Sequence, residues 1–121
     1  MRDPTRPALL LRLDGLVLAA VGLVLYRELG VSWWLFILVF LVPDLSILVY
    51  VVHRGIGARA YNLAHTYLWP GALFGLGFVA AHGWLMAVSL VWLIHIGLDR
   101  ALGLGLKYPD APFRETHLQR V

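Results

Sequence analysis

Residues 91–100 read Val91-Trp92-Leu93-Ile94-His95-Ile96-Gly97-Leu98-Asp99-Arg100, an apolar run that contains a histidine and an aspartate four residues apart. On a helix this spacing places both side chains on one face, one turn apart. Ionisable groups are costly in hydrocarbon, so within apolar helices they pair with one another or serve a function. We therefore expect His95 and Asp99 to face the interior of a helical bundle, where other segments bring polar groups to the same depth.

The composition of the chain is that of a membrane protein. Of its 121 residues, 60% are hydrophobic and only 14% are charged, which is too little polar surface for a soluble domain of this size. The net charge of +3 does not indicate a nucleic-acid partner, because the basic residues lie at the chain ends and in one loop, where topology and anionic lipid headgroups account for them. The lack of cysteine excludes disulfides, thiolate metal sites and cysteine nucleophiles.

Apolar stretches predict an all-α fold, an integral membrane four-helix bundle that forms a single domain over residues 1–121. A helix needs about 20 mainly apolar residues to cross the bilayer core. We predict spans at about residues 8–26, 33–52, 60–81 and 84–102, followed by a tail at 103–121. Gly30 is the expected stop of the first span, and Ser32 is the expected N-cap of the second. Gly71 and Gly75 have the spacing of closely packed membrane helices.

The distribution of basic residues predicts the orientation in the membrane. One side of the predicted bundle carries Arg2, Arg6, Arg54, Arg59, Lys107, Arg114 and Arg120, whereas the other carries only Arg27, next to Glu28. The positive-inside rule then places both termini and the middle loop in the cytoplasm. We expect a multi-pass protein of the inner (plasma) membrane.

Each predicted span brings a polar group to a similar depth. At a rise of 1.5 Å per residue, Asp14, Asp44, His65 and His95 each lie roughly 8–12 Å from the cytoplasmic end of their span, with Asn62 and Asp99 shallower. Two imidazoles and up to three carboxylates at one depth can bind a divalent metal such as Zn, Mn or Fe without cysteine. Pro43, directly before Asp44, also frees a backbone carbonyl one turn earlier, which must find another donor in lipid.

These residue types suggest individual roles. We predict His65, His95 and Asp99 as metal ligands, Asp44 as a ligand or catalytic group, and Asp14 as a general base that activates water. Further candidates would hold an anionic headgroup or phospho-substrate, or support or close the site: Arg100, Lys107, Arg114, Asn62 and His117. The alternatives are structural: Asp14 paired with Arg12 or Arg100, Asp44 as a cap of the broken helix, Asn62 as a helix–helix hydrogen bonder, and the histidines as packing residues.

The chain resembles a family of small bacterial four-helix membrane proteins of unknown function. The resemblance covers nearly the whole chain. It is carried by Leu11-Arg12-Leu13-Asp14-Gly15, Pro43-Asp44-Leu45-Ser46, Tyr61-Asn62-Leu63-Ala64-His65-Thr66-Tyr67, His95-Ile96-Gly97-Leu98-Asp99-Arg100, Leu106-Lys107-Tyr108 and Thr116-His117-Leu118. It implies the fold and the membrane location but no activity.

A looser similarity is to the membrane-bound metal-dependent hydrolases. The corresponding segments are Pro43-Asp44, His53-Arg54-Gly55, His65-Thr66 and His95 with Asp99, in the same order along the chain. The paired acidic motif around the proline is missing here, and the order of the histidine and threonine is reversed. The similarity implies metal-dependent hydrolysis at these residues.

Three functional hypotheses follow from the sequence. The first is a membrane-embedded, metal-dependent hydrolase that acts on a phospho- or ester substrate at the bilayer surface. The second is a haem b protein with His65 and His95 as axial ligands. The third is a proton-coupled module or a structural subunit without catalysis, in which the polar groups only hold the helices together. Four short spans would require oligomerisation for transport. The lipid bilayer is the expected partner in every case.

Overall fold

The structure is a computed structural model that describes residues 5–107 and 116–120. The helices are α1 (Pro7–Leu29), α2 (Trp33–Leu41), the 3₁₀ turn η1 (Val42–Leu45), α3 (Ser46–Val52), α4 (Arg54–Ala64), α5 (Leu68–Val79), α6 (Gly83–Ala101) and the short α7 (His117–Arg120). Within the described residues the β structure is limited to one antiparallel bridge between Lys107 and Thr116. The predicted all-α class is therefore confirmed for this part of the chain. Arg114 lies outside it.

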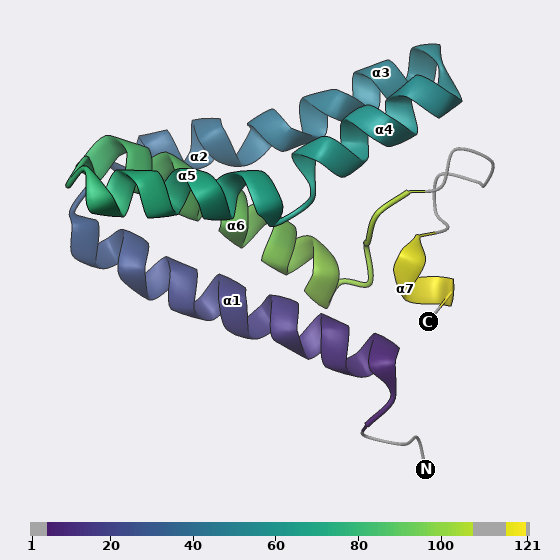
Figure 1. Ribbon diagram of the computed structural model, residues 1–121, viewed down its shortest axis with the longest axis horizontal. Helices are drawn as coiled ribbons and strands as arrows, with labels where there is room; N and C mark the ends of the chain where they lie inside the picture. The colour runs from purple at the N-terminus through teal and green to yellow at the C-terminus, as the bar shows by residue number, and fades with distance from the viewer. Residues whose placement is uncertain (1–4, 108–115, 121) are drawn as a thin grey trace.

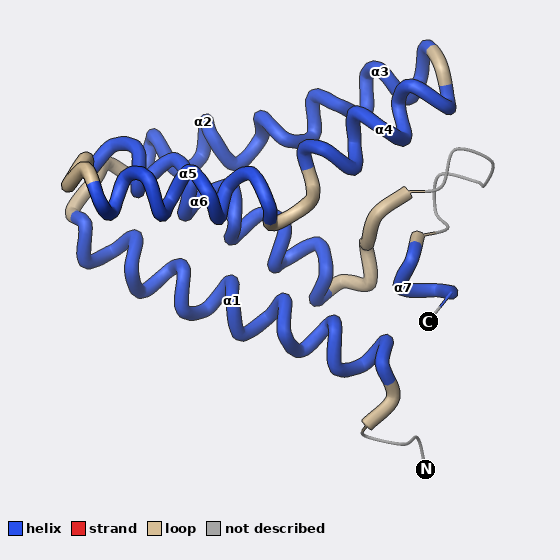
Figure 2. Tube along the Cα trace, in the orientation of Figure 1, coloured by secondary structure: helices blue, strands red, loops and turns tan. Residues whose placement is uncertain are grey.

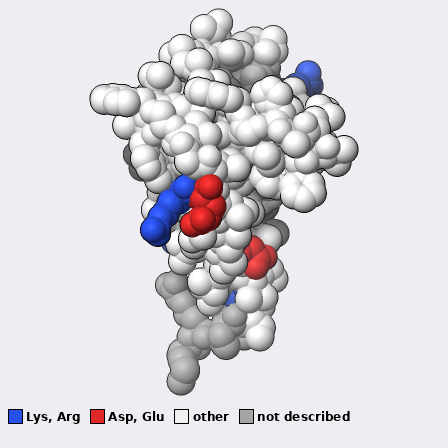
Figure 3. Space-filling model, turned by 90° about the vertical axis from the view of Figure 1, so that its left-hand side faces the viewer, with Lys and Arg blue, Asp and Glu red and all other residues white. Residues whose placement is uncertain are grey.

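Three helical stretches are long and apolar enough to cross a membrane, namely Pro7–Leu29, Trp33–Val52 and Gly83–Ala101. Their outward-facing side chains are large and apolar, with Val17 61% and Leu38 65% exposed, as expected for a surface that contacts lipid. The chain runs back and forth along the molecule, so α1 begins and α6 ends at the same end (Figure 1). The opposite end shows few charged groups (Figure 3).

The turn between α1 and α2 forms as the sequence predicts. Gly30 ends α1 in the left-handed conformation, with φ of 68°, which glycine adopts without steric cost. Ser32 is the N-cap of α2, and its hydroxyl accepts a hydrogen bond from the Trp34 amide at 3.2 Å. The Tyr26 hydroxyl donates to the Ser32 carbonyl at 2.6 Å, so the end of α1 is tied to the start of α2.

The helices α1 and α6 pack closely through a pair of glycines. Gly15 and Gly97 lie directly against each other, and a Cβ atom on Gly97 would come within 2.6 Å of the Gly15 carbonyl oxygen. Next to this contact, Ala19, Tyr26 and Ile94 are fully or almost fully buried. The predicted packing glycines Gly71 and Gly75 do not take part, because added Cβ atoms there would meet nothing within 4 Å.

The second predicted span is bent at Pro43. The helix changes from α to 3₁₀ at η1, and the Val42 amide bonds to the Val39 carbonyl three residues earlier. In this pattern the next amide would donate to the Phe40 carbonyl, but Pro43 has no N–H. His95 of α6 supplies the missing contact, with its Nδ1 atom 2.6 Å from the Phe40 oxygen. The freed carbonyl predicted from Pro43 is thus satisfied by a histidine.

The third predicted span, 60–81, is two helices. The chain leaves the helix after Ala64 and resumes it at Leu68, with a short loop between α4 and α5 (Figure 2). Pro70 explains the restart, because a proline is accepted in the first turn of a helix but not in its interior. The indole N–H of Trp92 on α6 donates to the Ala64 carbonyl at 2.6 Å, which satisfies the broken end in an apolar environment.

The described part of the C-terminal segment folds back against the bundle. The Asn62 side chain binds the Lys107 backbone in both directions, donating to its carbonyl at 2.8 Å and accepting from its amide at 2.6 Å. Thr116 and Leu118 are buried, and the Gln119 amide donates to the Gly103 carbonyl at 3.0 Å. This places the segment beside the C-terminal end of α6 (Figure 1).

Candidate metal centre

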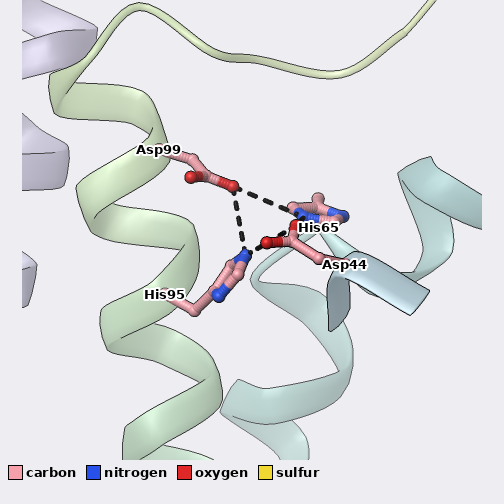
Figure 4. Close-up of side chains that lie close together, drawn as sticks. All are labelled: Asp44, His65, His95 and Asp99. Carbon is pink, nitrogen blue, oxygen red and sulfur yellow. Dashed lines mark hydrogen bonds and ion pairs between the residues drawn. The ribbon is translucent and has the colours of Figure 1, made fainter. Parts of the chain in front are cut away.

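Four of the predicted residues converge at one point between three parts of the fold. Asp44 comes from η1, His65 from the loop after α4, and His95 and Asp99 from successive turns of α6 (Figure 4). Each offers one donor atom, and these four atoms lie within 4.8 Å of one another. We refer to these four residues as the Asp/His cluster.

The donor atoms alternate between nitrogen and oxygen. His65 Nε2 lies 3.2 Å from Asp44 Oδ1 and 3.4 Å from Asp99 Oδ2. His95 Nε2 lies 3.2 Å from the same Asp44 oxygen and 3.3 Å from the same Asp99 oxygen. Each imidazole thus contacts both carboxylates, and each carboxylate uses a single oxygen for both imidazoles.

Backbone carbonyls set the orientation of both rings. His65 Nδ1 lies 2.9 Å from the Tyr61 carbonyl and His95 Nδ1 lies 2.6 Å from the Phe40 carbonyl. A carbonyl only accepts hydrogen bonds, so both Nδ1 atoms must carry a proton. This contact to the outer ring nitrogen is the usual way in which proteins orient a metal-binding histidine.

The assignment of Nδ1 as donor determines what faces the centre of the cluster. A neutral ring protonated at Nδ1 presents a bare lone pair at Nε2, and that lone pair would then face carboxylate lone pairs at 3.2–3.4 Å. Four acceptors at this separation repel one another unless positive charge lies between them. The arrangement therefore requires extra protons on the imidazoles or on the carboxyl groups, or a cation at the centre.

Four of the six ligand–ligand distances agree with those around a tetrahedral metal ion, and the other two, nitrogen to nitrogen and oxygen to oxygen, lie within 4.8 Å. The edge of a tetrahedron is about 1.63 times its radius, so Zn–N and Zn–O bonds of about 2.0–2.1 Å give ligand–ligand distances of about 3.3–3.4 Å. The four nitrogen–oxygen distances of 3.2–3.4 Å agree with this value. One divalent ion would also neutralise the two carboxylates, which matters in an environment of low dielectric constant.

The cluster is closed on the histidine side and open on one edge. His65 and His95 are 2% and 1% exposed, whereas the Asp99 and Asp44 side chains are 18% and 44% exposed. The Tyr61 ring stacks on the His65 ring at a centroid distance of 3.7 Å. Solvent or a ligand can therefore reach the cluster from the Asp44 side.

The remaining predicted residues surround the cluster or lie apart from it. Asp14 does not join it, and its side chain is exposed on α1. Arg100 donates to the His65 carbonyl at 3.3 Å and lies over the Tyr67 ring. Lys107 is buried, with its ammonium 4.9 Å from the centre of the Tyr61 ring. The Asn62 side chain uses both its amide nitrogen and its oxygen to hold the Lys107 backbone.

His117, in the C-terminal segment, contacts residues next to the cluster. Its Nδ1 accepts a hydrogen bond from the Leu106 amide at 2.8 Å, and its Nε2 lies 3.3 Å from the Arg100 guanidinium. Burial, together with the positive charge of Arg100, lowers the pKa of His117 below its ordinary value. Burial also lowers the pKa of Lys107, and the nearby Asp99 carboxylate acts in the opposite direction.

Two contributors to the cluster were not predicted. Tyr61 covers the His65 ring with its side chain and orients it with its carbonyl; the only sequence signal is its position four residues before His65. The Phe40 carbonyl orients His95. Its signal is Pro43, three residues later, which indicates that a carbonyl is freed but not which group will bind it.

The geometry does not fit the haem hypothesis. A porphyrin held by the two histidines would lie between their rings, but the ring centroids are 5.2 Å apart. The oxygens of both aspartates also lie within 3.4 Å of both Nε2 atoms, in the space that the macrocycle would need. The cluster fits a single ion and not a haem.

Comparison with known proteins supports the family resemblance. A family model described as "Domain of unknown function (DUF4260)" matches residues 8–121, which is nearly the whole chain. No curated protein and no solved structure gave a significant match.

Proposed function

Because the chain belongs to the family described as a domain of unknown function (DUF4260), its role has to be derived from its own residues, and we propose that it binds one divalent metal ion in the Asp/His cluster. Zn²⁺ is the best match, since it takes mixed nitrogen and oxygen ligands in a tetrahedron, whereas Mn²⁺ prefers more oxygen ligands. The protein would be a multi-pass membrane protein of the inner membrane.

One observation carries this proposal. Both imidazoles donate from Nδ1 to backbone carbonyls, so both Nε2 lone pairs point at carboxylate oxygens at 3.2–3.4 Å. A divalent ion between these atoms would remove the repulsion, and its charge would balance that of the two carboxylates. Extra protons would also remove the repulsion, but a histidine that donates its Nδ1 proton to a backbone carbonyl is the usual arrangement of a metal ligand.

For the topology we propose four spans with both termini in the cytoplasm. The start of α1 and the end of α6 share one end of the molecule, and the basic residues Arg54 and Arg59 both belong to α4, which follows the second pass. The third pass would be formed by α5 together with the segment around His65. The helix α5 has 12 residues and spans about 18 Å, which is shorter than the bilayer core. Its flanking loops would therefore also lie within the bilayer.

Metal binding is tested by elemental analysis of detergent-purified protein that has been stripped and reloaded with Zn²⁺. We expect one Zn²⁺ per chain in the wild type and little in His95→Asn. His82→Asn is the matched control, because His82 caps the start of the same helix and asparagine is also a good N-cap. Wild-type protein without stoichiometric metal, or His95→Asn that binds as well as the wild type, would contradict the proposal.

A second candidate function is metal-dependent hydrolysis of an ester or phospho-substrate. It is favoured by the Asp44 side chain, which is 44% exposed, because catalytic zinc sites keep one position accessible to water. If Asp44 moves off the metal, a water can take its place and Asp44 can accept a proton from it.

Hydrolysis is tested with chromogenic ester and phosphate monoester substrates on zinc-loaded and zinc-free protein. We expect turnover only in the zinc-loaded form, and a loss of about 10²-fold or more in Asp44→Asn if its carboxylate acts as the base. The zinc content of this variant is measured in parallel, so that loss of metal is distinguished from loss of the base. Equal rates with and without zinc would exclude hydrolysis at the cluster.

A further inference from the structure

An apolar groove lies beside the Asp/His cluster. The helices α2 and α5 both pack against α6 but make little direct contact with each other, and the space between them has a volume of about 300 Å³. Val39 of α2 and Leu73 of α5 form its walls, and Val88 of α6 forms its floor. We call this space the α2/α5 groove.

The groove and the cluster share neighbouring residues. Pro43, Ala64 and Trp92 also line the groove. The first two directly precede Asp44 and His65 in the chain, and Trp92 lies one turn before His95 on α6. The Trp92 N–H and the Ala64 carbonyl bond to each other at 2.6 Å, so this end of the groove presents no unsatisfied polar atom. An elongated ligand could therefore reach from the groove to the cluster.

The accessible edge of the cluster lies where the groove ends. Asp44 is the most exposed member of the cluster, at 44%, and the residue before it, Pro43, belongs to the wall of the groove. A ligand with an apolar chain in the groove would thus present its polar end to the Asp44 edge of the metal.

The charge around the cluster favours an anionic polar end. A divalent ion and two carboxylates sum to zero, whereas Arg100 next to the cluster adds a positive charge. Arg100 contacts the His65 carbonyl and His117, and among residues 5–107 and 116–119 no carboxylate lies within ion-pair distance of its guanidinium. The surroundings of the proposed metal therefore carry net positive charge in a region of low dielectric constant.

We propose that the α2/α5 groove and the metal together bind a lipid, with its alkyl chain in the groove and an oxygen of its phosphate headgroup in a fifth position on the metal, at the Asp44 edge. This inference rests on the proposed metal site. The groove faces the bilayer, because Val42, which lines it, and Leu38, next to the lining residue Val39, are 55% and 65% exposed. A lipid chain is the molecule that surrounds such a surface, and it alone combines an apolar length with an anionic end there.

The two parts of the site make different contributions to binding. Moving an alkyl chain from the bilayer into the groove gains little, because lipid tails are as apolar as the groove itself. The headgroup therefore provides most of the affinity, and close packing of the chain in the groove adds a smaller share, about tenfold, and selects the length of the chain.

The test compares dodecyl phosphate with inorganic phosphate on zinc-loaded protein in one detergent, by calorimetric titration. Leu73→Trp fills the groove, and Leu76→Trp is the matched control, since it places the same side chain on the outer face of the same helix. We expect dodecyl phosphate to bind at least about tenfold more tightly than inorganic phosphate to the wild type and to Leu76→Trp. Leu73→Trp is expected to lose this preference while it still binds inorganic phosphate.

The outcomes separate the two proposals. A wild type that binds no zinc contradicts the proposed function. A wild type that binds one zinc per chain, with the same preference for dodecyl phosphate in Leu73→Trp, overturns the lipid site alone. A change from dimer to monomer in Leu73→Trp would overturn it as well, because the groove would then hold a second copy of the chain. If Leu73→Trp loses its zinc, Val39→Phe narrows the same groove from α2 and replaces it in the test.

Discussion

His95 connects two parts of the molecule through its two ring nitrogens. Its Nδ1 binds the Phe40 carbonyl that Pro43 leaves without a backbone donor, and its Nε2 faces Asp44 and Asp99. The bend in the second span and the Asp/His cluster therefore depend on the same side chain. This explains why a histidine is buried to 1% exposure in the most apolar part of α6.

We predict that His95→Ala destabilises the metal-free protein as well as the loaded one. Without the ring, the Phe40 carbonyl is left unsatisfied in an apolar environment, which costs about 1–3 kcal/mol. The measurement is the free energy of unfolding in detergent after chelation of metals. Asp44→Asn is the control, because it alters the cluster but leaves the Phe40 contact in place. Equal stability of His95→Ala and the wild type would show that the carbonyl is satisfied in another way.

We predict that docking of the C-terminal tail depends on pH through His117. Its pKa is lowered when the tail is docked, by burial and by Arg100, whereas a detached tail would titrate near the ordinary value of about 6.5. The detached form therefore binds a proton first as the pH falls. Docking is fully present above about pH 6.5 and weakens below it.

The hydrogen bond from the Leu106 amide to His117 Nδ1 provides the readout, since a protonated ring cannot accept it. We expect the hydrogen-exchange protection of Leu106 to fall between pH 7.5 and 5.5, beyond the change in intrinsic exchange rate. His117→Asn offers an acceptor that does not titrate, so its protection should stay constant. The same pH profile in both proteins would rule out His117 as the cause.

At the level of helices, the contact between α1 and α6 determines where the cluster lies. Gly97 sits between His95 and Asp99 in the chain and packs against Gly15 of α1. Any displacement of α6 away from α1 therefore also moves two members of the cluster. Close packing through small residues is the main source of helix association in lipid.

We predict that Gly97→Ala destabilises the protein by about 1–3 kcal/mol and weakens zinc binding. The new Cβ atom would lie 2.6 Å from the Gly15 oxygen and 3.2 Å from the Ala19 amide nitrogen, and backbone atoms cannot move without shifting a helix. Thermal unfolding and zinc titration measure the two effects. Gly75→Ala is the control, since its Cβ atom meets nothing within 4 Å. A stable Gly97→Ala protein would mean that the two helices separate at little cost.

Local sequence signals predicted the ends of elements well. Gly30 ends α1 and Ser32 caps α2 as expected, because these positions depend on neighbouring backbone atoms only. The break between α4 and α5 was not predicted, although Pro70 was visible. Hydropathy records how apolar a stretch is and does not show where its hydrogen bonds are interrupted.

The sequence predicted which residues of the candidate site share a depth, but not which of them face the same point. Depth along the spans brought Asp44, His65, His95 and Asp99 together, and the structure places them within 4.8 Å. Asp14 has a similar depth but lies apart, because Gly15 faces α6 and adjacent residues on a helix point about 100° apart. Depth can be read from sequence position, whereas rotation about the helix axis depends on which face packs.

On the scale of the whole molecule, the Asp/His cluster joins three segments that also contact one another through apolar packing and through the hydrogen bonds of Trp92 and His95. Asp44 belongs to the bent second span, His65 to the break after α4, and His95 and Asp99 to α6. Membrane helices lack a hydrophobic driving force for association, so contacts of this kind hold them together. A metal at the cluster would tie all three segments to one point.

Zinc should therefore stabilise the entire bundle. A ligand that binds only the folded state adds about 4 kcal/mol at a free concentration a thousand times its dissociation constant. We expect the thermal midpoint of the wild type to rise with added Zn²⁺ and to return after chelation, with no rise in His95→Asn. The gain should shrink on acidification, because protons compete with Zn²⁺ for its ligands. A midpoint that is independent of zinc would contradict metal binding at the cluster.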